Sequence, residues 1–249
     1  MSEIYLRNVL RKYQVNVLAA KVNATKLHPI IDSWGNRFIL SKNFSGSLEK
    51  GTAVNIGTDA DIFISLSSTT PETLEQIYTT LYNRLIQSGY PAKKQNVSIG
   101  ITINNYNIDL VPAKRQHNYG NDHSLYKNKT STWTQTNVTT HINYVKNSNR
   151  LEEIKLLKIW RCLHRLSLPS FYLELVVINV LKGSKIGDVV NNFIKVLRFL
   201  ANDFLNYRVI DPANTNNIIS NDLTVLEKNR IVKQAEISLS KKNWSEIIW

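Results

Sequence analysis

Three aspartates in two short apolar segments are the residues of this chain best suited to chemistry. Asp59 and Asp61 stand two residues apart in DADIFISLS, and Asp109 lies in NIDLVP. Alternating hydrophobicity predicts that each segment is a strand, so Asp59 and Asp61 project from the same face. Three clustered carboxylates repel one another unless a cation neutralises them, and hard oxygen ligands select Mg²⁺ or Mn²⁺ over zinc. The pattern predicts a divalent-metal site, while a DxD pair on its own is also typical of a turn acid followed by an edge-strand charge.

A glycine-containing loop precedes the acids. Gly46-Ser47 lies 12 residues before Asp59 and follows an apolar stretch that begins near Arg37. A small hydroxyl residue beside a glycine, in a turn that opens a helix, offers free backbone N–H groups to a triphosphate. A Gly-Ser dipeptide alone indicates only a turn. Gly-Ser, the following Gly51-Thr52, the DxD pair and the later Asp109 segment together form an ordered pattern that favours nucleotide binding.

The elements that must position these residues change character near the middle of the chain. The first half predicts a mixed sheet with flanking helices, and the second half predicts helices with no competing strand pattern. The predicted domains are therefore residues 1–130, a catalytic lobe with an N-terminal helix, and residues 131–249, a helical lobe that completes a nucleotide cleft. The predicted elements are a helix within 3–32, strands near 37–44, 59–67, 95–104 and 106–113, a helix over 71–88, a loop over 114–140, and helices over 150–167, 170–182, 186–204 and 224–241.

Composition narrows the classes of function. The chain has 249 residues and a formal charge of +12, so nucleotides, nucleic acid and other polyanions are natural partners. A single cysteine, Cys162, excludes an internal disulfide, and no ligand cluster for structural zinc is present in the sequence. The longest apolar run, residues 171–181, is too short for a membrane span, and the first residues do not resemble a secretion signal. We therefore expect a cytoplasmic protein that does not enter a membrane.

The quoted segments resemble the DNA polymerase β-like nucleotidyltransferase superfamily. The matching residues are Ser45 to Leu66 and Asn107 to Ala113. In the helical half, Lys155 to Trp160, Leu168 to Ile178 and Ile210 to Ile218 look most like the oligoadenylate synthetase group and its bacterial relatives, the cGAS/DncV-like nucleotidyltransferases of antiphage signalling. The resemblance covers residues 37–235 and implies an α+β fold, with a polymerase β-like palm followed by a helical C-terminal lobe. Archaeal-type CCA-adding enzymes share the Gly-Ser and DxD pattern.

The resemblance also implies a catalytic role for the three acids. Asp59 and Asp61 would hold two metal ions, Mg²⁺ or Mn²⁺. Asp109 would join one of the ions and help to activate the acceptor hydroxyl. Two metals about 3.5–4 Å apart can stabilise both the attacking and the leaving oxygen of an in-line displacement on a phosphate.

Five further residues match nucleotide-binding positions of the family. Gly46 and Ser47 would bind the donor triphosphate, and Thr52 matches a threonine of the same loop. Lys158 matches a lysine that reaches the phosphates, although nearby Lys155 is an alternative. Ser170 matches a position near the phosphates, and it is equally placed to be the N-cap of the following helix. The predicted nucleotide-binding residues are thus Gly46, Ser47, Thr52, Lys158 and Ser170.

The implied activity is formation of a cyclic or linear oligonucleotide second messenger from NTPs or dNTPs, with release of pyrophosphate, in antiphage defence. One alternative is nucleotide transfer to a macromolecule, such as a tRNA or other RNA 3′ end or a protein hydroxyl, which the basic charge favours. Another is an inactive nucleotide-binding module, against which the intact acids argue. Candidate partners are an activating or accepting nucleic acid and an effector or inhibitor protein from the same operon.

Overall fold

Two compact units make up the chain, and each is built from segments that are far apart in sequence. The computed structural model describes residues 2–57 and 59–249. Of these, residues 16–50 and 59–142 form one unit, here called the sheet unit, and residues 2–15, 51–57 and 143–249 form the other, the helical unit. The sequence prediction divides the chain once, at residue 130, whereas these units interleave along the chain.

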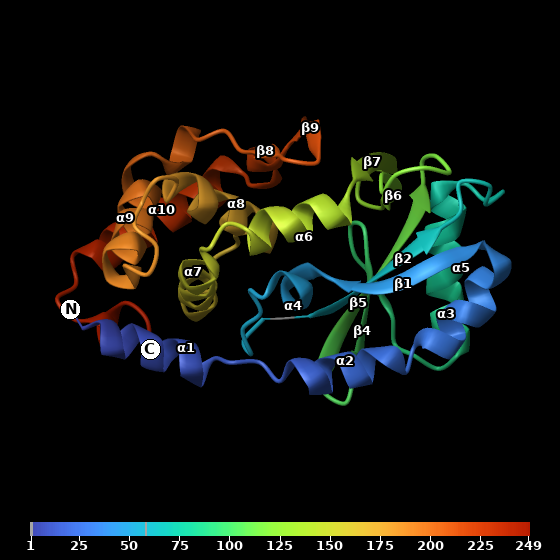
Figure 1. The fold of residues 1–249 in the computed structure, drawn as a ribbon, viewed down its shortest axis with the longest axis horizontal. Coiled ribbons are helices and arrows are strands. Elements are labelled where there is room, and N and C mark those ends of the chain that lie inside the picture. The colour runs from blue at the N-terminus through green and yellow to red at the C-terminus, as the bar shows by residue number, and fades with distance from the viewer. Residues whose placement is uncertain (1, 58) are drawn as a thin grey trace. The chain divides into compact units, whose positions relative to one another are not determined.

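A mixed seven-stranded sheet is the framework of the sheet unit. Its strands are β1 (Ile39–Ser45), β2 (Ala60–Leu66), β3 (Lys93–Lys94), β4 (Ile99–Ile103), β5 (Tyr106–Arg115), β6 (His123–Lys127) and β7 (Thr132–Thr136). The order is β1-β2-β5-β4-β3, with β6 paired to β5 and β7 paired to β6. Only β2 and β5 are parallel among the described pairs, and they run side by side at the centre of the unit (Figure 1). The predicted α+β class with a mixed sheet is confirmed.

Burial on both faces explains the composition of β2. Six of its seven residues are buried, and a central strand that is covered on both sides reads as an almost continuous apolar run. Helix α5 (Leu74–Gln87) packs against β5 and β6 through its buried apolar face. It begins at a capping box in which the Thr73 hydroxyl accepts from the Gln76 N–H, and the Gln76 side chain accepts from the Thr73 N–H. The predicted helix over 71–88 is therefore present and starts at Thr73.

The strands predicted near residues 95–104 and 106–113 are present and form a hairpin. Strands β4 and β5 pair in antiparallel register across Asn104 and Asn105. Both asparagines have positive φ, 49° and 64°, which is the backbone conformation that a tight two-residue hairpin turn requires. Asparagine tolerates this left-handed region better than most residues, so the Asn-Asn dipeptide is sufficient.

Residues 114–140 are not the long loop that the sequence predicts. They contain the β6–β7 hairpin and the start of helix α6 (Val138–Lys146). The prediction was wrong because polar residues occupy buried positions in these strands: His123 is 4% exposed and Thr136 is 7% exposed. The alternation of hydrophobicity that would mark a half-buried strand is therefore missing.

A single N-terminal helix within residues 3–32 is also wrong. The segment forms α1 (Glu3–Lys12), α2 (Val17–Thr25) and α3 (His28–Gly35). Asn16 starts a new helix because its side chain accepts a hydrogen bond from the Ala19 N–H at 3.0 Å. Pro29 lies in the first turn of α3, where its missing N–H costs nothing, so it begins a helix rather than ending one.

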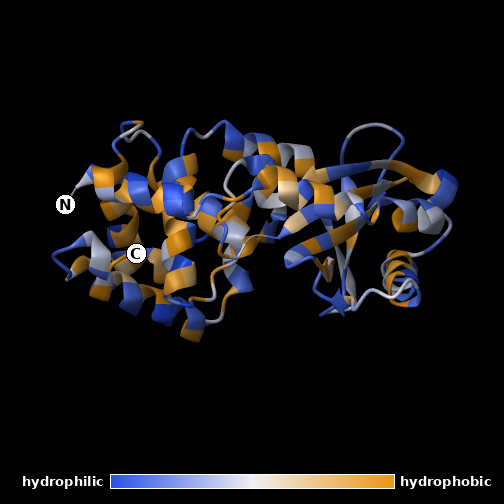
Figure 2. Ribbon diagram, turned by 90° about the horizontal axis from the view of Figure 1, so that it is seen from below, coloured by the Kyte–Doolittle hydropathy of each residue, from blue (hydrophilic) through white to orange (hydrophobic). Residues whose placement is uncertain are grey.

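The helical unit contains the four helices predicted for the second half of the chain. They are α7 (Leu151–Leu163), α8 (Ser170–Val180), α9 (Val189–Asn202) and α10 (Val225–Leu239). Their apolar faces meet in a core that includes Trp160, Tyr172 and Phe193, all fully buried. Figure 2 shows hydrophobic and hydrophilic residues alternating along the helices, as expected where only one face is buried. No helix in the described ranges is long and apolar enough to cross a membrane.

A short hairpin and a buried arginine complete this unit. Strands β8 (Ile210–Asp211) and β9 (Asn214–Ile218), which the sequence does not predict, pair across a tight turn that Asp211 closes by accepting from the Ala213 N–H.

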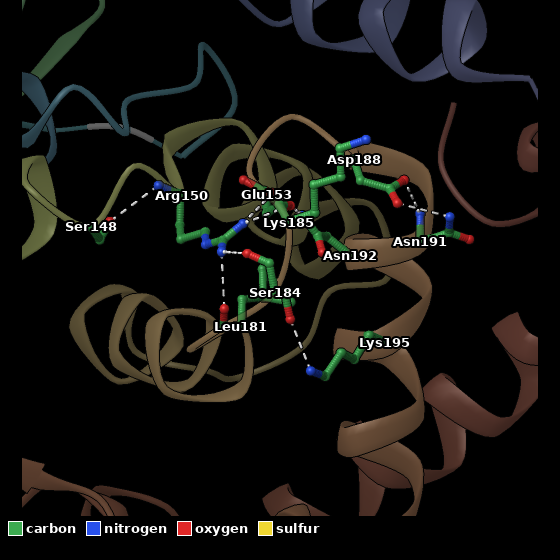
Figure 3. A network of polar contacts seen from close by, with 10 residues as sticks. All are labelled: Ser148, Arg150, Glu153, Leu181, Ser184, Lys185, Asp188, Asn191, Asn192 and Lys195. Carbon is green, nitrogen blue, oxygen red and sulfur yellow. Dashed lines mark hydrogen bonds and ion pairs between the residues drawn. The ribbon is translucent and has the colours of Figure 1, made fainter.

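Arg150 precedes α7 and donates to the backbone carbonyls of Leu181, Ser184 and Lys185 (Figure 3). These bonds tie the loop between α8 and α9 to the start of α7.

Candidate active site

The turn between β1 and α4 (Gly46–Lys50) brings a glycine against one of the acids. Gly46 has φ +58°, a left-handed conformation that L side chains rarely adopt. A Cβ placed on Gly46 would lie 1.7 Å from Oδ2 of Asp61, which leaves no room for any side chain. Ser47 follows in the first turn of α4, where backbone N–H groups have no partner within the helix. The sequence-predicted Gly-Ser turn and Asp61 therefore lie together.

The register of the sheet brings the other acids to the same place. Asp61 and Asp109 are directly paired neighbours on the parallel strands β2 and β5, so their side chains share one face. Asp59 directly precedes β2, two residues before Asp61. The charge of Asp59 also acts on Asp109, because it is one of the causes that raise the Asp109 pKa. The structure therefore brings Asp61 and Asp109 together on one face of the sheet, beside Gly46, with Asp59 close enough for its charge to act on Asp109.

Asp109 is held by two side chains that the sequence analysis missed. Gln95 Nε2 donates to Asp109 Oδ1 at 2.9 Å, and Ser98 Oγ lies 3.2 Å from Asp109 Oδ2. Tyr78, buried on α5, donates to the carbonyls of both Gln95 and Ser98 and so fixes the turn that carries them. We call Gln95 and Ser98 the Asp109 clamp. The sequence could have indicated them only by their position, because they lie just before β4, the strand that pairs with the strand of Asp109.

Burial and neighbouring charge change the acidity of Asp109. Its pKa is raised from 3.8 to about 6, mainly by desolvation and also by the charge of Asp59, while hydrogen bonds from Ser98 and Gln95 oppose the shift. A carboxyl group in this state binds a proton readily when no cation is present. A positive charge placed among the acids would stabilise its ionised form.

The donor set fits a hard divalent cation. Three carboxylates offer the oxygen ligands that Mg²⁺ and Mn²⁺ prefer, and the charge of Asp59 acts on Asp109. Among the described residues, no group of three His, Cys, Asp or Glu side chains is gathered closely enough to form a closed metal site. The residues therefore have the chemistry for Mg²⁺, and their coordination geometry is not defined by the protein alone.

Thr52 and Lys158 lie in the helical unit, in a buried polar cluster that we call the Lys158 cluster. Lys158 Nζ donates to Glu174 Oε1 at 2.7 Å and to Thr52 Oγ1 at 2.9 Å, and Thr52 Oγ1 donates to the same Glu174 oxygen at 2.7 Å. The side chains of Lys158 and Glu174 are 3% and 1% exposed. The cluster fixes residues 51–57 to α7 and α8. The predicted phosphate contacts of Thr52 and Lys158 stay predictions, whereas Lys155 is half-buried on α7.

Ser170 opens α8, but it is not the N-cap. Pro169 occupies the cap position without a side-chain hydrogen bond, and Ser170 is the first helical residue. Its hydroxyl accepts from Arg161 Nη1 at 3.0 Å, and the same guanidinium nitrogen donates to the Leu168 carbonyl at 2.8 Å. The alternative of an N-cap is therefore wrong, and the predicted role of Ser170 near the phosphates stays a prediction.

The predicted site residues fall into two sets. Gly46, Ser47, Asp59, Asp61 and Asp109 belong to the sheet unit and converge there. Thr52, Lys158 and Ser170 belong to the helical unit, in which Thr52 and Lys158 touch each other.

Comparison with known proteins identifies the fold. No family model matches the chain, and no curated protein matches its sequence. Solved structures do match: CdnC of E. coli MS115-1 with ATP has a TM-score of 0.78 at 17% identity, over 99% of this chain and 97% of that one. A second CdnC structure is a complex with HORMA-deltaN, with a TM-score of 0.77 at 17% identity over 97% and 95%.

Two other matches extend the comparison. The Elizabethkingia meningoseptica CdnE cyclic dinucleotide synthase, with GTP and Apcpp, has a TM-score of 0.71 at 15% identity, over 97% of this chain and all of that one. The Cid1 poly(U) polymerase bound to MgATP has a TM-score of 0.66 at 14% identity, over 94% and 92%. The chain therefore has the DNA polymerase β-like nucleotidyltransferase fold, as the sequence resemblance predicts. Within this fold it is similar to the CD-NTases CdnC and CdnE.

Proposed function

We propose that this chain is a metal-dependent nucleotidyltransferase that joins NTPs into a short cyclic or linear oligonucleotide and releases pyrophosphate. The observation that carries the proposal is the convergence of Asp61 and Asp109 on one sheet face beside Gly46, with the charge of Asp59 acting on Asp109. The similarity to CdnC with ATP and to the CdnE cyclic dinucleotide synthase supports it.

Each of the five predicted site residues in the sheet unit would have a role in this reaction. Asp59 and Asp61 would hold the metal, and Asp109 would complete the ligand set. A bound divalent cation supplies neutralisation of charge on the phosphate and activation of a hydroxyl. The N–H groups at Gly46 and Ser47 would bind the triphosphate, because phosphate oxygens accept from free backbone donors at the start of a helix. Asp109, which Gln95 and Ser98 hold by hydrogen bonds, would receive or share the proton of the acceptor hydroxyl.

The test is incubation of the purified chain with radiolabelled NTPs or dNTPs and Mg²⁺ or Mn²⁺. We expect incorporation by the natural chain and its loss, by at least about 10²-fold, when Asp59→Asn and Asp61→Asn are combined. Asp203→Asn is the matched control, because Asp203 is an exposed acid of the helical unit. No product under any nucleotide and metal condition would contradict the proposal. Mass spectrometry of the product would distinguish a cyclic from a linear molecule.

Transfer to a macromolecular acceptor is the second candidate. The similarity to the Cid1 poly(U) polymerase and the formal charge of +12 favour it. Addition of purified tRNA to the same assay separates the two: label in the RNA supports this candidate, and label in a small phosphatase-resistant species supports a cyclic product. A protein partner is a further part of the proposal, supported by the complex of CdnC with HORMA-deltaN. Co-purification with the product of a neighbouring gene would test it.

A further inference from the structure

A polar cavity of about 250 Å³ lies in the sheet unit beside the acids' strands. Its polar lining includes Arg115, His123, Asn43, Asn121, Ser41 and Thr139, and Phe63 is among its apolar lining residues. No carboxylate is among the described residues that line it. Pockets that enclose a whole drug-sized ligand are about 300–1,000 Å³, so this cavity suits one group of a ligand rather than all of it.

Arg115 gives the cavity its charge. Its Nε is buried and has no hydrogen-bond partner. Leaving a buried donor unpaired is unfavourable, more so on a charged group. Because Nε is closed off from solvent, a ligand in the cavity would meet the guanidinium through its outer nitrogens, Nη1 and Nη2. Arginine binds phosphate particularly well because its planar guanidinium donates two parallel hydrogen bonds.

The neighbouring side chains add donors and no second charge. His123 is 4% exposed, its Nδ1 lies 2.8 Å from the Asn121 carbonyl, and its Nε2 lies 2.8 Å from Ser65 Oγ. Since a carbonyl can only accept, Nδ1 carries the proton, and Nε2 accepts from Ser65. His123 is thus a fixed wall of the cavity. Asn43 Nδ2 donates to Ser41 Oγ at 2.9 Å, and the Asn121 amide and the Thr139 hydroxyl also line the cavity.

The cavity lies on the same face of the sheet as the acids. On β2, Ser65 is four residues beyond Asp61, so the two side chains project from one face roughly 13 Å apart along the strand. On β5, Arg115 is six residues beyond Asp109 and has the same parity. The acids and Arg115 therefore share this face, with the apolar cluster of Phe63 and Ala113 between them.

We infer that the Arg115 cavity is a binding site for a phosphate group, separate from the Gly46-Ser47 turn. The group can come from free phosphate or from the 5′ end of the nucleotide whose hydroxyl is the acceptor. Only the second source rests on the proposed function.

The experiment is a titration of the full chain with inorganic phosphate in EDTA, followed by calorimetry and by ³¹P NMR. Loss of hydrogen bonds to a charged group predicts that Arg115→Gln weakens phosphate binding about tenfold or more. Arg115→Lys should retain part of the affinity, because it keeps the charge and loses the fork. Lys129→Gln is the matched control, an exposed cation of the same unit outside the cavity. Equal affinity of the natural chain and Arg115→Gln, or no phosphate binding by the natural chain, would overturn the inference.

Competition identifies the source of the phosphate. A 5′-phosphorylated dinucleotide should displace phosphate from the natural chain, and its 5′-hydroxyl analogue should not, if the site serves the acceptor. If neither displaces it, the site serves free phosphate. Because the titration needs no turnover, a chain that binds phosphate through Arg115 and incorporates no NTP would contradict the proposed function and leave this site standing.

Discussion

Replacement of Gly100 by alanine tests whether the Asp109 clamp positions that carboxylate for reaction. Gly100 pairs with Asp109 across β4 and β5. A Cβ at Gly100 would lie 2.6 Å from Gln95 Nε2 and 3.3 Å from Asp109 Oδ1. The first distance is too short, and the atom it meets is the end of a flexible side chain, so the amide must move. Gly100→Ala therefore breaks the 2.9 Å hydrogen bond from Gln95 to Asp109 without replacing a predicted ligand, and its Cβ makes a close contact with Asp109 Oδ1.

The size of the effect follows from the bond that is lost. A hydrogen bond to a charged group contributes about 1.5–3 kcal/mol. If the bond acts in the transition state, turnover should fall about 10- to 100-fold, since about 1.4 kcal/mol corresponds to a factor of ten. The bond also lowers the Asp109 pKa, so its loss should raise that pKa further above about 6. The acid limb of the pH–rate profile should then move to higher pH.

The assay is steady-state NTP incorporation across pH, with Asp109 followed separately by NMR in the metal-free protein. Gln95→Ala should reproduce both effects of Gly100→Ala. Gln87→Ala, at the exposed end of α5, should reproduce neither. If Gly100→Ala and Gln95→Ala both keep the natural turnover and pH profile, the clamp has no positioning role, and the reasoning fails.

Three further predictions concern stability. The pKa of Asp109 is raised from 3.8 to about 6, so its ionisation costs folding stability as pH rises through this range, and the cost is complete above about pH 6. Asp109→Asn should therefore raise the melting temperature of the metal-free protein at pH 8 but not at pH 4, and an equal effect at both would contradict this. Lys158→Met leaves the buried carboxylate of Glu174 without its cationic partner and should lower the free energy of unfolding by about 3–5 kcal/mol in urea titrations. Lys158→Met plus Glu174→Met should recover much of the loss. Burial lowers the pKa of His123 below 6.5, so its contribution to stability is present above pH 6.5 and is lost as pH falls through the folded-state pKa. In urea titrations, the free energy of unfolding should therefore differ less between pH 7.5 and pH 5 for His123→Gln than for the natural chain.

The acids and the Gly-Ser turn could be predicted from the sequence because each depends on local order. A spacing of two residues predicts Asp59 and Asp61 on one face, and a glycine before a short helix marks the turn at Gly46. The pairing of Asp61 with Asp109 needed only the assumption that two apolar strands are neighbours. These features need no knowledge of contacts between distant side chains.

The Asp109 clamp and the Lys158 cluster could not be predicted in this way. Gln95 reaches Asp109 only because β4 and β5 pair in one particular register, and Gly100 leaves space at that point. Glu174 reads as a polar interruption of an apolar helix until the fold brings Lys158 to it. In both cases the partner is chosen by packing, and hydrophobic periodicity contains no information on it.

The bonds made by Arg150 also govern how the helical unit meets a protease. The loop after α8 has the sequence LKGSKIGD, with exposed lysines at positions 182 and 185 that trypsin would recognise in an extended chain. A scissile backbone must straighten inside the protease, yet the carbonyls of Leu181, Ser184 and Lys185 are bound to one guanidinium. The loop should therefore survive limited digestion despite its glycines and lysines. Cleavage there becomes a sensitive report on whether the buried arginine is in place.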